Sequence, residues 1–215
     1  MSDGEQVSGT IRLKDLSFAV ERAQIVGWLY DDASGEVCWS IDVHGSAQRF
    51  GEGEVQQDLR PHFYDEVMPA RIDDWRRLEG FAYGVDLERD DAVGDSLPSL
   101  YLCSHLSLPR SELRLGARRG ARFALQWRGL AEANWDEGYG EGMPFQIDLD
   151  IPFAHQEVRY WHRGDGQDYE GAAREVMARR GLSGEHLRYR DHRRFRDDPA
   201  DEHYRLVRAF FAPVE

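Results

Sequence analysis

The sequence predicts an α+β fold: a predominantly antiparallel β-sandwich or curved sheet followed by two C-terminal α-helices. Three observations lead to this prediction. Apolar and polar residues alternate in several segments between residues 10 and 153, as they do in half-buried strands. No helix of crossover length recurs between these segments, which disfavours a parallel α/β sheet. After residue 160 the apolar spacing lengthens to that of a helix.

The first strands are expected between residues 10 and 44. Residues 10–13 and 16–21 are short strand candidates. Residues 24–30 and 37–44 flank a segment of turn-forming residues, so 24–44 is expected to form a hairpin. In its second strand the side chains divide between two faces, with Val37, Trp39, Ile41 and Val43 on one and Cys38, Ser40, Asp42 and His44 on the other.

Four further strands are expected at residues 81–87, 100–108, 122–128 and 145–153. The last of these has the strictest alternation. Its apolar face comprises Phe145, Ile147, Leu149, Ile151 and Phe153, opposite Gln146, Asp148 and Asp150. Residues 55–77 include two prolines and several aromatic residues without a clean period, and they predict a loop with at most a short helix.

Two helices are expected in the C-terminal third. The first covers 168–180, where apolar residues recur at helical spacing and Gly181 follows as a stop. The second covers 199–212, because Asp198 suits an N-cap and Pro199 the first helical position. Its apolar stripe would comprise Ala200, Tyr204, Val207, Phe210 and Phe211.

The chain is acidic, and the excess charge lies in its first part. It has 215 residues, 40 acidic and 27 basic side chains, and a net charge of −13. Residues 1–160 hold 29 acidic and 16 basic side chains, whereas residues 161–215 hold 11 of each. We therefore expect an acidic β-rich body (1–160) and a helical C-terminal segment (161–215) packed on it as one domain. Residues 110–128 interrupt the acidic body with six arginines.

This composition disfavours several classes of partner. Nucleic acid and anionic membranes attract clustered basic residues, so neither is expected to bind so acidic a chain. Residues 186–196 interleave five arginines with two aromatic residues, as single-stranded nucleic-acid sites do, but the overall charge favours neutralisation by the acidic body. The N-terminus lacks an apolar signal region, and the expected location is the cytoplasm.

The sequence predicts no catalytic residues, no metal site and no cofactor. Cys38, Ser40, Asp42 and His44 share one strand face, but a polar face of an antiparallel sheet is ordinarily solvated. The eight histidines lack the i, i+4 spacing of a helical metal site, and Cys38 and Cys103 cannot form a disulfide framework. A hydrolase stays open as an alternative if histidines on different strands, for example His44, His105 and His155, converge in a cleft.

The remaining candidates are residues that could bind a basic protein partner. Large aromatic side chains beside acids are suited to this role, since the rings anchor interfaces and the charges steer a basic partner. The candidate partner-binding residues are Trp135, Asp136, Glu137, Tyr139, Glu141, Asp73, Asp74, Trp75, Asp90 and Asp91.

Residues 123–129, the acidic turn around Trp135 and residues 144–153 together resemble segments of bacterial immunity proteins, which neutralise cognate toxins. The resemblance rests on a strand-turn-strand pattern of about 30 residues and assigns no functional residue. It implies tight binding to one toxin by covering a basic catalytic cleft. The first hypothesis is therefore a non-catalytic inhibitor of a basic protein partner. The other two are the hydrolase and a scaffold module whose C-terminal helix docks on a neighbour. The oligomeric state stays open.

Overall fold

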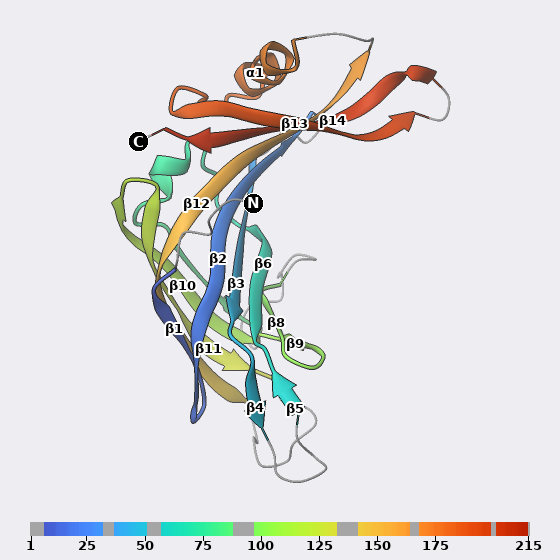
Figure 1. Ribbon diagram of the computed structural model, residues 1–215. Coiled ribbons are helices and arrows are strands. Elements are labelled where there is room, and N and C mark those ends of the chain that lie inside the picture. The colour runs from blue at the N-terminus through green and yellow to red at the C-terminus, as the bar shows by residue number, and fades with distance from the viewer. Residues whose placement is uncertain are drawn as a thin grey trace.

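The computed structural model describes residues 7–31, 37–50, 57–87, 97–132, 142–163, 168–198 and 201–214 (Figure 1). Within these ranges twelve strands form one large sheet, and β4 and β5 form a separate pair. The strands are β1 (Gly9–Leu13), β2 (Leu16–Tyr30), β3 (Val37–Gly45), β4 (Gln48–Phe50), β5 (Gln57–Leu59), β6 (His62–Met68), β7 (Ala82–Asp86), β8 (Ser99–Tyr101), β9 (His105–Ser107), β10 (Arg110–Arg119), β11 (Arg122–Ala131), β12 (Met143–Arg163), β13 (Leu187–Asp198) and β14 (Asp201–Pro213).

The sheet order is β7-β10-β11-β12-β1-β2-β3-β6-β8-β9, and β13 and β14 extend it through β12. Neighbouring strands are antiparallel except β12 and β2, which also pair in parallel. The sheet curves strongly, as Figure 1 shows. The predicted hairpin over 24–44 is confirmed by the pairing of β2 with β3.

The longest strand, β12, belongs to two parts of the sheet. Its first half pairs with β11 and β1, with Leu149 opposite Gly9. The strand β1 pairs with β12 only as far as Gly9. Beyond that point β12 pairs with β2 instead, with Phe153 opposite Ile25. The close approach depends on Gly9, because a Cβ there would lie 2.3 Å from the Cβ of Leu149. The second half of β12 then pairs with β14 and carries the C-terminal hairpin.

The core lies on one face of the curved sheet and is rich in aromatic side chains. The largest fully buried residues include Trp39, Trp127, Phe18, Phe63, Phe123, Phe153 and Phe211. A short 3₁₀ helix, Trp75–Leu78, adds Trp75, whose ring stacks on Phe153 with centroids 5.1 Å apart. Trp39 donates its indole N–H to the carbonyl oxygen of Ile72 at 3.0 Å. Burial of these large rings supplies much of the driving force for this fold.

The predicted fold class with two C-terminal α-helices is wrong. Residues 201–213 form the strand β14, in which Val207, Ala209 and Phe211 are buried at strand spacing and Phe210 is buried as well. They pair with β12 on one side and β13 on the other. The described chain is mostly strand, with one α-helix, so the segment 161–215 is not helical as a whole.

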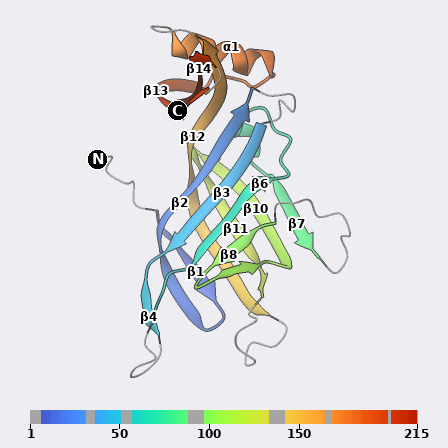
Figure 2. The same cartoon turned by 90° about the vertical axis from the view of Figure 1, so that its right-hand side faces the viewer.

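That helix, α1 (Tyr169–Arg179), confirms the predicted helix over 168–180. The Asp168 carboxylate accepts a hydrogen bond from the Gly171 N–H at 2.8 Å, and Gly181 ends the helix with φ of +72°. In Figure 2, α1 lies above the β13–β14 hairpin, at the opposite end of the molecule from β4. No helix among the described residues has the length and apolar character of a membrane span.

The expected loop over 55–77 is also corrected in part. It contains the strands β5 and β6, and only the Trp75–Leu78 turn matches the short helix that was expected. In β6 the buried positions include Phe63 and Asp65. Because Asp65 is a charged residue at a core-facing position, the sequence of β6 does not show the apolar–polar alternation expected of a strand.

Candidate functional site

The polar face of β3 and β6 holds a cluster of two histidines and one aspartate. Asp42 and His44 alternate along β3 with the buried Ile41 and Val43, so both point away from the core. His62 of β6 lies directly opposite His44 in the strand register. The structure therefore confirms the shared face of Asp42 and His44 and adds His62, which the sequence prediction placed in a loop.

The carboxylate of Asp42 contacts both imidazoles. Its Oδ1 lies 2.7 Å from Nε2 of His44, and its Oδ2 lies 3.0 Å from Nε2 of His62. The two rings stack, with centroids 3.8 Å apart and planes 13° apart. The carboxylate and side chains are only partly exposed, at 30% for Asp42, 15% for His44 and 27% for His62. Together they could hold a metal ion.

The exposed Arg22 of β2 adds a positive charge to the cluster. Its Nη2 lies 2.7 Å from Nε2 of His44. Burial lowers the pKa of His44, Asp42 opposes this effect, and the charges of His62 and Arg22 lower the pKa further. The neutral imidazole is therefore favoured. In that state its Nε2 lone pair accepts a hydrogen bond from Arg22.

A line of aromatic and imidazole rings continues from the cluster toward β9. Tyr64 packs against His62, with ring centroids 4.9 Å apart, and its hydroxyl hydrogen-bonds to Nδ1 of His105 at 2.8 Å. Tyr101 of β8, the strand between β6 and β9, also packs against His105, with centroids 5.0 Å apart. His155 does not join this line. It packs against Phe210 of β14, so the convergence of His44, His105 and His155 that the hydrolase alternative required is not formed.

The other polar residues expected beside Asp42 have separate environments. Ser40 donates a hydrogen bond to the carbonyl oxygen of Val26 at 3.4 Å. Cys38 lines a cavity of about 490 Å³ whose charged lining consists of Arg71, Asp73, Arg77 and Arg180. Arg180 is ion-paired to Asp31 at 3.3 Å, so the charge of this wall is partly compensated.

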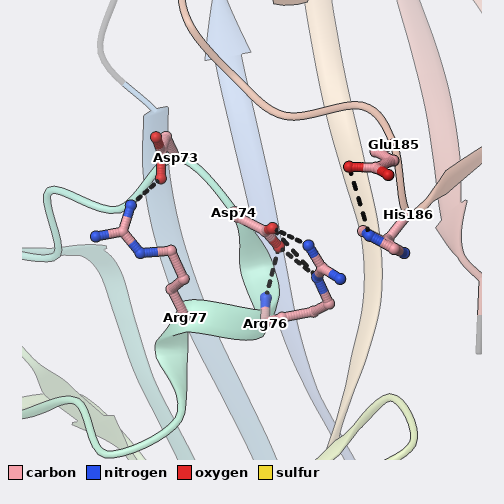
Figure 3. A network of polar contacts seen from close by, with 6 residues as sticks. All are labelled: Asp73, Asp74, Arg76, Arg77, Glu185 and His186. Carbon is pink, nitrogen blue, oxygen red and sulfur yellow. Dashed lines mark hydrogen bonds and ion pairs between the residues drawn. The ribbon is translucent and has the colours of Figure 1, made fainter.

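Two of the predicted partner-binding residues, Asp73 and Asp74, are neighbours with arginine partners of their own (Figure 3), and Asp73 also lines this cavity. Asp73 forms an ion pair with Arg77, and Asp74 with Arg76, both at 2.6 Å. Burial alone would raise the pKa of Asp74, but hydrogen bonds from Arg76 outweigh it and lower the pKa below its usual value. Trp75 is only 2% exposed, which corrects its expected role as a surface anchor. Neither acid is an isolated charge.

The other predicted partner-binding residues lie outside the described residues. They are Asp90, Asp91, Trp135, Asp136, Glu137, Tyr139 and Glu141. The segments outside the described ranges, including those that contain these residues, are strongly acidic as a group. These segments carry 15 of the 40 acidic side chains but only Arg89 of the 27 basic ones. The described residues hold 25 acidic and 26 basic side chains, so the whole excess of negative charge lies between and beyond them.

Comparisons with known proteins add no assignment: no family model matches the chain, and neither the curated proteins nor the solved structures contain a match.

Proposed function

We propose that the chain is a non-catalytic binding protein that neutralises a basic protein partner, as an immunity protein neutralises its toxin. The distribution of charge carries the proposal. Fifteen acids stand against one base in the segments outside the described ranges, while the described residues are almost neutral. A like-charged set of this size creates a field that speeds the approach of a basic partner.

The acids of the sheet itself are poor candidates for the same role. Several are already paired on the same surface, as Glu112 is with Arg128 at 2.6 Å and Asp150 with Arg119 at 2.5 Å. A partner would have to compete with these arginines. The segment 133–141 instead combines three acids with Trp135 and Tyr139 and contains no basic residue. This segment is the proposed centre of the interface.

The proposal can be tested by capturing a partner from the native organism and measuring its affinity by calorimetry. Neutralising Asp136, Glu137 and Glu141 as amides should weaken binding at least about tenfold and flatten its dependence on salt between about 50 and 300 mM. Trp135→Ala should weaken binding with the salt dependence kept, because it removes contact area and no charge.

Glu112→Gln is the matched control, since it removes one paired acid of the sheet and should leave the affinity unchanged. An unaltered affinity and salt dependence in the triple variant would refute the proposed interface. A captured partner with an acidic surface would refute the proposed class of partner.

A further inference from the structure

We propose that Asp42, His44 and His62 form a binding site for a divalent transition-metal cation such as Zn²⁺. This site goes beyond the proposed partner binding and does not depend on it. Two imidazole nitrogens and one carboxylate oxygen are a donor set that zinc and its neighbours in the first transition row prefer. All three ligand atoms lie within 4.8 Å of one another.

The backbone places the ligands without help from a mobile segment. Asp42 and His44 are two residues apart on β3 and thus share one face. His62 is the register partner of His44 on the antiparallel strand β6. Cross-strand partners hold their Cβ atoms about 4.5–5.5 Å apart, close enough for both side chains to reach one ion. Both strands have buried opposite faces, so the site stands on a rigid part of the sheet.

The distances are close to those of a metal site. Bonds of about 2.0–2.2 Å hold neighbouring ligand atoms about 3 to 3.5 Å apart. The carboxylate of Asp42 lies 2.7 Å from Nε2 of His44 and 3.0 Å from Nε2 of His62. Small rotations of the side chains would therefore admit an ion. Three protein ligands leave further coordination positions for water or another ligand.

The lone pairs of His44 Nε2 and Asp42 Oδ1 also favour a cation at this position. A guanidinium only donates hydrogen bonds, so the contact of Arg22 at 2.7 Å needs an unprotonated Nε2 on His44. That nitrogen then faces Oδ1 of Asp42, a buried oxygen that has no hydrogen-bond partner among the residues that the structure describes. Two acceptor atoms at 2.7 Å repel each other unless positive charge lies near both. Arg22 supplies that charge here, and because its side chain is exposed it can turn away when a metal ion enters.

The experiment is titration of the full chain with ZnCl₂ by calorimetry, with CoCl₂ and visible absorption as a second measurement. We expect one strong equivalent of zinc and a cobalt spectrum more intense than that of the hydrated ion. His62→Ala and Asp42→Asn should each weaken zinc binding about tenfold or more. Arg22→Ala should tighten it, because that variant removes a competing cation from His44.

His105→Ala is the matched control, since His105 lies on the same face but contacts Tyr64 rather than Asp42. It should leave zinc affinity unchanged. Circular dichroism establishes that each variant is folded, and if His62→Ala does not fold, His62→Gln replaces it. Zinc binding that is equal in the His62 variant and the native chain would overturn the proposal, as would an equal loss in His105→Ala. Neither outcome would affect the proposed partner binding.

Discussion

At the scale of single residues, Glu157 is a buried carboxylate that forms ion pairs with two arginines. It is 5% exposed, and its Oε1 contacts Nε of Arg159 and lies 3.2 Å from Nε of Arg208. Arg159 and Arg208 are direct register partners on β12 and β14, so their like charges face each other. Arg159 also lies over the ring of Tyr30, 4.7 Å from its centroid. The carboxylate holds this junction together, since opposed like charges destabilise a sheet.

Glu157→Gln should therefore destabilise the protein by about 3 kcal/mol, because it leaves two guanidinium groups without their shared counter-ion. Urea unfolding followed by circular dichroism measures the effect. Glu112→Gln is the control: its pair with Arg128 joins side chains that are 57% and 71% exposed, and its loss should cost at most about 1 kcal/mol. Equal costs for the two variants would contradict the role given to Glu157.

At the scale of elements, the local sequence pattern predicts correctly those strands in which apolar and polar residues alternate clearly. It gives the wrong element where contact with neighbouring strands decides between helix and strand. Residues 145–153 show strict alternation and lie within β12. Residues 201–213 satisfy both periods, because Val207 and Phe211 are spaced for a helix while Val207, Ala209 and Phe211 are spaced for a strand. Pairing with β12 and β13 selects the strand, and this contact is not visible in the local sequence.

The contact between β10 and β11 gives a test of element packing. A Cβ on Gly129 would lie 2.1 Å from the carbonyl oxygen of Arg110, a backbone atom that cannot move without separating the strands. Gly129→Ala should therefore cost about 3 kcal/mol or more in unfolding free energy. Gly116→Ala is the matched control on β10, because its nearest contact would be an ordinary 3.4 Å. A thermal midpoint as high for Gly129→Ala as for Gly116→Ala would show that the strands adapt.

At the scale of the whole molecule, the candidate site shows what a sequence can and cannot reveal. The shared face of Asp42 and His44 follows from period two alone, and was predictable. His62 is 18 residues further along the chain and joins them only because β6 pairs with β3. The short alternation of His62, Phe63 and Tyr64 was the available signal, but the buried Asp65 and the following bulge obscured it.

Asp65 also links distant parts of the sheet. Tyr83 of β7 donates a hydrogen bond to its Oδ2, and the N–H of Val67 donates to its Oδ1 at 3.1 Å. The strands β6 and β7 are far apart in the sheet order, so this contact crosses the inside of the curve. Burial raises the pKa of Asp65 from 3.8 to about 6, with a smaller contribution from the charge of Glu66.

The raised pKa sets the sign of a pH effect on stability. Between pH 4 and 6 the folded state binds the Asp65 proton more tightly than the unfolded state, so its contribution to stability is present at low pH and lost as pH rises through 6. The full loss is about 3 kcal/mol. Asp65→Asn lacks this titration, so the native chain should lose stability relative to the variant between about pH 4 and 7 in urea unfolding. The exposed Asp148→Asn should parallel the native profile. If the stability profile of Asp65→Asn also paralleled the native profile, this would show that the Asp65 carboxyl is already ionised at pH 4 in the folded state. The hydrogen bonds from Tyr83 and Val67 would then stabilise a buried carboxylate rather than a neutral carboxyl.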